Sequence, residues 1–163
     1  MGCFAPGLAA HLSHDAVHHF VKSGVISPAD GPNAEAERQW HVALDGCVAA
    51  CRIYVAAGVR WAVDTFLLPD VVSLWAGLQD LRVGVIVLRP DVEVAVRRNA
   101  ARLRETGWGV PEWQVRANHE AMGAWVGCRD AFVVDNSRTD QTQVLAVIDE
   151  WEGRMVENRW NGS

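Results

Sequence analysis

Three aspartates stand where a parallel-sheet protein would carry its chemistry. Asp15, Asp64 and Asp135 each end, or shortly follow, a short apolar run that is typical of a strand. Ligands of such sheets bind beyond the carboxyl ends of the strands. Carboxylates at that edge suit Mg²⁺ binding and the activation of a hydroxyl group for attack on phosphorus. The alternative, which fits Asp135 best, is that each carboxylate only caps a helix or forms a turn.

Two arginines are the next candidates. Arg98 and Arg102 lie four residues apart on one face of a predicted helix, with Arg97 and Arg104 nearby. A pair of guanidinium groups can hold a phosphoryl group and offset the charge that develops during its transfer. The alternative is a solvated face near a helix C-terminus, where arginine also complements the helix dipole.

Histidines and an isolated tryptophan carry weaker signals. His14 and His18 have the spacing of two metal ligands on a helix and stand beside Asp15, but no third or fourth ligand follows nearby. Surface or capping histidines are the simpler interpretation. Trp108 lies between Gly107 and Gly109 after the arginine-bearing helix, where it would line a pocket or pack against the protein.

Cysteine usage predicts reduced thiols. Cys47 and Cys51 share the apolar face of a long predicted helix, so we expect core residues rather than a redox pair. The four cysteines, which include Cys3 and Cys128, have no Cys-x-x-Cys spacing. This usage is typical of a cytoplasmic protein.

Composition limits the partners. The 163 residues are 50% hydrophobic and suit a single domain, 1–163, with its own core. A net charge of −5 argues against nucleic acid and anionic membranes as partners and leaves a small molecule. No apolar run reaches the roughly 18 residues of a membrane-spanning helix, and no basic leader opens the chain.

Strands and helices alternate along the chain. We expect strands at 8–13, 59–64, 83–88 and 131–135, and helices at 14–22, 34–57, from Pro69, from 92 to Thr106, at 111–125 and at 139–154. Asn33 has the residue type of an N-cap, and Gly58 that of a C-terminal stop. This alternation predicts an α/β fold of three layers, a parallel sheet with helices on both faces.

The sequence contains no phosphate-binding loop of the Walker A type. That loop needs Gly-x-x-x-x-Gly-Lys-Ser/Thr, because backbone N–H groups surround the phosphates and a lysine reaches their oxygens. The single lysine, Lys22, has no glycine at the required spacing before it. Arginine is a poor replacement, since its guanidinium fork is too wide for the loop.

Four segments, taken in order, nevertheless resemble the P-loop kinases of the chloramphenicol phosphotransferase and zeta-toxin type, relatives of adenylate and gluconate kinases. The segments are His11–Val17, Gly58–Thr65, Val87–Pro90 with Glu93, Val94 and Arg97–Arg102, and Val133–Ser137. They look like the second to fifth strands of that fold and the residues that follow them. The resemblance implies a P-loop NTPase-like fold, use of ATP and Mg²⁺, and phosphoryl transfer to the hydroxyl group of a small molecule.

The resemblance also implies roles for individual residues. Asp15 would be the base on the acceptor side, and Asp64 the Walker B-like residue that holds Mg²⁺. Arg98 and Arg102 would form the clamp of the lid helix. By the same resemblance, Asp135 and Arg138 would bind the nucleotide, and His14 and Trp108 would bind the substrate.

The family's first strand and phosphate loop have no counterpart, since seven residues precede Leu8. Two hypotheses follow. In the first, the protein is a kinase whose loop was removed by a start codon placed too far downstream or by a deletion. In the second, the chain is a non-catalytic remnant that serves as a binding or assembly module. A second copy or a partner chain would then cover the strand edges left by the missing central strand. In-frame codons for the loop before Met1 would favour the kinase.

Overall fold

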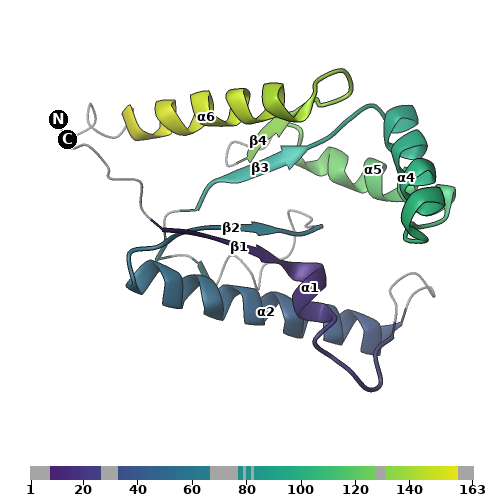
Figure 1. Cartoon of the computed structure of the whole chain (residues 1–163), viewed down its shortest axis with the longest axis horizontal. Helices are drawn as coiled ribbons and strands as arrows, with labels where there is room; N and C mark the ends of the chain where they lie inside the picture. Colours follow the sequence, from purple (N-terminus) through teal and green to yellow (C-terminus); the bar gives the residue numbers. More distant parts are fainter. Residues whose placement is uncertain are drawn as a thin grey trace. The chain divides into compact units, whose positions relative to one another are not determined.

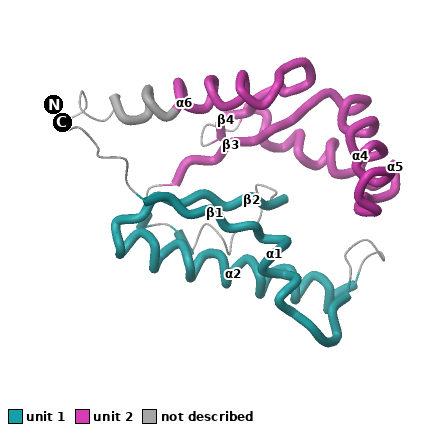
Figure 2. Tube along the Cα trace, viewed as in Figure 1, with its two compact units in different colours: residues 1–82 teal, residues 83–163 magenta. Residues whose placement is uncertain are grey.

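The computed structural model describes residues 8–26, 33–66, 77–78, 80–81, 83–127 and 131–157. The chain divides into two compact units, Met1–Arg82 and Val83–Ser163 (Figure 2). Each unit pairs two parallel strands, so the described strands form two separate two-stranded sheets. The helix expected from Pro69, and Cys3, Trp75 and Cys128, lie wholly or largely outside the described residues.

The first unit packs one long helix against a strand pair (Figure 1). Its elements are β1 (Ala9–Ser13), α1 (His14–His18), α2 (Ala34–Ala56) and β2 (Arg60–Asp64). β1 and β2 run parallel in a register that sets Ala9 against Arg60 and Ser13 against Asp64. On α2, Leu44, Cys47 and Cys51 are each 1% exposed. The two cysteines are therefore core thiols, as predicted from their spacing.

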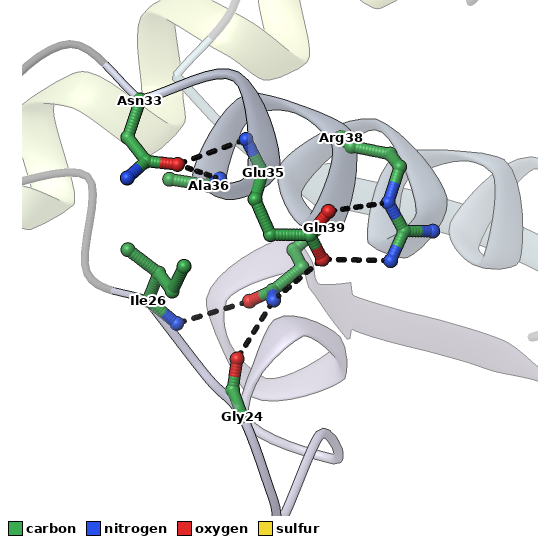
Figure 3. A network of polar contacts seen from close by, with 7 residues as sticks. All are labelled: Gly24, Ile26, Asn33, Glu35, Ala36, Arg38 and Gln39. Atoms are coloured by element: carbon green, nitrogen blue, oxygen red, sulfur yellow. Dashed lines mark hydrogen bonds and ion pairs between the residues drawn. The ribbon is translucent and has the colours of Figure 1, made fainter.

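A polar network fixes the start of α2 (Figure 3). The Asn33 side chain accepts hydrogen bonds from the Glu35 and Ala36 N–H groups, at 2.9 and 3.2 Å, so the predicted N-cap is confirmed. One turn later, the buried Gln39 amide donates to the Gly24 carbonyl at 2.9 Å and accepts from the Ile26 N–H at 3.1 Å. Gln39 thereby anchors the chain that leaves α1 onto α2.

α1 is shorter than the sequence predicts. The helix expected to continue to Lys22 ends at His18, and turn hydrogen bonds carry the chain on to Val21. Histidine, phenylalanine and valine are weak helix formers, and the segment His18–Val21 consists of these types alone. Too few residues remain to offset the cost of a second turn without packing to support it.

The second unit repeats the parallel pairing with more helices. Its elements are β3 (Val85–Leu88), α4 (Val92–Thr106), α5 (Glu112–Ala121), the 3₁₀ helix η2 (Met122–Trp125), β4 (Ala131–Val134) and α6 (Gln141–Glu157). β3 lies against β4, with Val85 opposite Ala131 and Leu88 opposite Val134. Asp91 caps α4, and Gly107 ends that helix in the left-handed region at φ 75°. The sequence placed α4 correctly, and it placed the strands to within two residues.

Aromatic packing closes one end of this unit. The Trp151 ring of α6 stacks on Phe132 of β4, with ring centroids 5.3 Å apart and planes 3° from parallel. Gly84, just before β3, faces the same indole, and a Cβ atom there would lie 2.5 Å from the Trp151 ring. Trp125 of η2 is buried, whereas Trp113 of α5 is 63% exposed.

The fold class is thus mixed α/β with small parallel sheets, while the expected three-layer sheet is not established by the described residues. In β2, half-buried Trp61 and Val63 alternate with exposed neighbours, so one face of this strand is more buried than the other. None of the described helices is long and apolar enough to span a bilayer.

Replacing Asn33 with alanine should destabilise the first unit by about 1 kcal/mol, because two N–H groups of the first turn of α2 lose their acceptor. Chemical denaturation followed by circular dichroism measures the change. N33D is the control and should stay near wild type, since aspartate accepts the same two hydrogen bonds. Equal losses in N33A and N33D would contradict the cap.

Glycine-to-alanine changes should act in opposite directions at two sites. G84A should destabilise the second unit by about 1–3 kcal/mol, because the added methyl group meets the Trp151 ring. G46A should leave stability unchanged or raise it by up to about 1 kcal/mol, since Gly46 lies within α2 and, among the described residues, its methyl group would meet Val17 at an ordinary 3.5 Å. Thermal melts of both variants test the pair. A stable G84A would show that Trp151 packs elsewhere.

Candidate functional site

The carboxyl ends of β1 and β2 meet at one edge of the first unit. The register sets Ser13 directly opposite Asp64, so the chain leaves the two strands at the same level. α1 starts at the next residue, His14, and Asp15 is an exposed residue of its first turn. The structure therefore brings the segments of two predicted site residues, Asp15 and Asp64, to the same sheet edge.

Asp64 has two polar partners on β1. Its Oδ1 contacts His11 Nε2, and its Oδ2 accepts a hydrogen bond from the Ser13 hydroxyl at 3.2 Å. The His11 and Asp64 side chains are 68% and 58% exposed. Sequence reasoning did not select His11 or Ser13. The sequence did contain a signal for them. His11 and Ser13 are two residues apart on a predicted strand, so their side chains lie on the same face of the sheet.

His14 is buried and has a partner at each ring nitrogen. It is 1% exposed; Nε2–H donates to the Trp40 carbonyl at 3.0 Å, and Nδ1 accepts from the Thr65 hydroxyl at 3.0 Å. The ring also meets the Trp40 indole edge to face, with centroids 4.6 Å apart. Burial lowers the pKa of His14 and outweighs the hydrogen bond to Trp40 and the charges of Asp15 and Asp64, which raise it. The neutral tautomer is the form that fits this environment.

The interpretation of His14 and His18 as surface or cap residues is wrong, because both are buried where α1 packs on α2. His18 Nε2 has no hydrogen-bond partner among the described residues. Both ring nitrogens of His14 are engaged, so in this conformation the ring offers a ligand no free atom. Its assignment to the substrate stays a prediction.

In the second unit, the loops after β3 and β4 are tied together. Ser137 donates its hydroxyl and its N–H to Asp135 Oδ1, the N–H at 2.8 Å, and accepts from the Asp91 N–H at 2.7 Å. The Ser137 hydroxyl, then its N–H and the charge of Arg138, lower the pKa of Asp135. Asp135 thus forms the turn that the sequence favoured, with a carboxylate that stays ionised.

The two arginines of α4 have different partners. Arg98 Nη2 donates to the Asn136 carbonyl at 2.8 Å, which joins α4 to the loop after β4. Arg102 Nη2 contacts Asn99 on its own helix at 3.3 Å. Both side chains are exposed. Trp108, 68% exposed, follows the end of α4. In the same loop, the Val110 carbonyl accepts from the Asn99 amide at 2.8 Å, and the Val110 N–H donates to Asn99 Oδ1 at 3.2 Å.

A hollow of about 400 Å³ opens beside these loops. Its lining residues are Arg89, Pro90, Asp91, Val92, His119, Val133 and Asp135. Among the described residues, Arg89 Nη2 makes two long contacts, 3.4 Å to the His119 carbonyl and 3.5 Å to its Nδ1, and the buried Arg89 Nε has no partner there. His119 Nε2–H donates to the Pro90 carbonyl at 3.0 Å. Sequence reasoning placed Arg89 at a strand end but missed His119, which α5 brings from 30 residues away.

The hollow combines a guanidinium group, two carboxylates and apolar side chains. No group of three or more His, Cys, Asp or Glu residues in the described part of the chain is arranged to hold a metal ion. Asp64 alone is a weak Mg²⁺ site, because both its oxygens already accept from β1.

Comparison with known proteins adds the fold type. The chain matches no protein-family model and no curated protein. It is similar to the solved structure of the Deinococcus radiodurans tunicamycin resistance protein, with a TM-score of 0.55 over 91% of this chain and 84% of that one, at 18% sequence identity. At this level of identity the likeness is one of fold alone, and it agrees with the mixed α/β class of this chain.

The stability of the protein should fall as the pH drops through about 6.5, the ordinary pKa of histidine. The pKa of His14 is lowered in the folded state, so the unfolded chain takes up the proton first, and the loss continues down to the folded-state pKa. Urea unfolding between pH 8 and pH 5 measures this slope. It should shrink in H14Q and persist in the control H41Q, which changes a less buried histidine of α2. Equal slopes in wild type and H14Q would place the titration elsewhere.

Proposed function

We propose that this protein is an ATP-dependent phosphotransferase that acts on the hydroxyl group of a small molecule. The observation that carries the proposal is the register of β1 and β2, which brings the segments of Asp15 and Asp64 to one sheet edge. The P-loop kinase-like fold of the structural neighbour supports the same reaction class. In that class, catalysis consists mainly of positioning and charge stabilisation.

Asp15 is the base that accepts the proton of the acceptor hydroxyl. Its exposed carboxylate stands in the first turn of a helix whose start is fixed by the buried His14. A base of this kind must lie within hydrogen-bond reach of the proton that it removes, which an exposed residue at the sheet edge permits. Asp64, whose position is set by His11 and Ser13, takes the Mg²⁺ role through intervening water.

In the second unit, α4 and the two post-strand loops serve the nucleotide. Arg98 and Arg102 are the cations of the lid helix, and Arg98 already contacts the backbone of the loop after β4. Asp135, Arg138 and the hollow beside them take the base, with Arg89 as donor. ATP supplies the phosphoryl group, and these residues orient it and balance its charge.

The structural neighbour suggests one acceptor to test. That protein is described as a tunicamycin resistance protein, so tunicamycin is the first acceptor to test on this chain. Trp108 is exposed after the lid helix and offers an aromatic surface to such a molecule.

A second candidate function is a binding or assembly module without catalysis. Two observations favour it. Both oxygens of Asp64 are engaged by protein groups, and the described residues include no metal-ligand cluster. Under this hypothesis, the kinase-like fold persists while the transfer step is lost. Ligand binding without turnover is then the expected behaviour.

Phosphoryl transfer is tested by incubating the protein with γ-labelled ATP, Mg²⁺ and tunicamycin, or a panel of small alcohols and sugars, and separating the products. We expect acceptor-dependent label transfer. D15N should reduce the rate about 100-fold or more, as expected for loss of a general base. The matched control is D45N, which removes an exposed carboxylate from α2 and should transfer label at the wild-type rate.

The contrary outcomes are distinct. ATP binding in calorimetry without transfer to any acceptor would favour the binding module. Absence of both binding and transfer would exclude the phosphotransferase for this chain. Equal loss of transfer in D15N and D45N would show that the assay reports folding rather than the proposed base.

A further inference from the structure

We infer that His14 is a positioning residue, which sets the place of Asp15 relative to Asp64 by joining the ends of β1 and β2. The inference rests on the proposed function for its catalytic consequence, but its structural part stands on the contacts of the ring. It gives His14 a role that does not require it to touch the substrate.

The location of His14 is the first argument. The backbone ladder between β1 and β2 ends at Ser13 and Asp64, because α1 starts at the next residue. Beyond that point, the Thr65 hydroxyl donates to His14 Nδ1 at 3.0 Å. This side-chain hydrogen bond therefore continues the strand pairing by one more step, between the residues that adjoin the two carboxylates.

The His14 ring is also held on its other side, by α2. His14 Nε2–H donates to the Trp40 carbonyl of α2 at 3.0 Å, and the Trp40 indole packs against the ring. A ring that is 1% exposed and fixed at both nitrogens has little freedom. Since Asp15 follows His14 directly, the backbone of Asp15 inherits that restraint.

The rate of the proposed transfer depends on the distance between Asp15 and the groups that react with it. A displacement of about 1 Å in a reacting group can cost up to about 100-fold in rate. The Asp64 carboxylate is held by His11 and Ser13, whereas Asp15 is exposed and is not held by burial of its own side chain. The link through His14 and Thr65 supplies the restraint on Asp15.

Isosteric changes at Thr65 test the link without opening a cavity. T65V removes the hydroxyl donor and keeps the shape, whereas T65S keeps the hydroxyl. For T65V we expect kcat of label transfer to fall about tenfold or more, with KM for ATP unchanged. T65S should restore most of the rate. H14Q, which can keep the donor to Trp40 but lacks Nδ1, should resemble T65V.

Backbone amide hydrogen exchange gives a readout independent of activity. T65V should speed exchange at His19, Phe20 and Val21, whose N–H groups donate to carbonyls of α1, and leave the middle of α2 unchanged, while T65S should match wild type. Unchanged exchange and rate in T65V overturn the inference. So does faster exchange throughout the first unit, which would mean a general loss of stability. A third outcome separates the two proposals. If T65V shows the local change in exchange but the wild-type protein transfers no label, the link is upheld and the proposed function is rejected.

Discussion

Parallel pairing of β1 with β2 is the constraint on which the site of the first unit depends. Parallel strands bring their carboxyl ends to the same edge, and the register sets Ser13 against Asp64 with no offset. The residues that follow must then diverge within one or two positions, into α1 on one side and toward Thr65 on the other. The contacts of Asp64 with His11 and Ser13 follow from that arrangement.

The second unit obeys the same constraint with other side chains. β3 and β4 end level with one another, and Ser137 joins the loops that follow by contacts to Asp91 and Asp135. Arg98 adds a bond from α4 to the same loop. These hydrogen bonds join the two loops that line the hollow to each other and to α4.

Sequence patterns predicted the regular elements well because their signals are local. The apolar runs predicted the strands. Asn33 predicted the start of α2, because its side chain accepts a hydrogen bond from the Ala36 N–H, three residues along the chain. α1 was predicted too long, since nothing in the periodicity of His18–Val21 shows that packing support ends there. The division into two small sheets is a matter of long-range pairing, which periodicity does not report.

The site was predicted in part for the same reason. Asp15 and Asp64 stand at strand ends, and a strand end is visible in sequence. The burial of His14 is not, because it depends on Trp40 and Thr65, 26 and 51 residues away. His119, on α5, lines the hollow, and His11 of β1 contacts Asp64 of the neighbouring strand. Contacts of this kind need the registers and helix packing that only the structure supplies.

Nuclear magnetic resonance with a nonhydrolysable ATP analogue and Mg²⁺ tests the central claim most directly. Amide shifts are mapped with the analogue and Mg²⁺ together and with Mg²⁺ alone. The account predicts saturable shifts at Asp64 and Thr65 in the first unit and at Asp135–Arg138 in the second, with Asp45 and its neighbours unmoved. Shifts confined to other surfaces, or no shifts at saturating analogue, would contradict it.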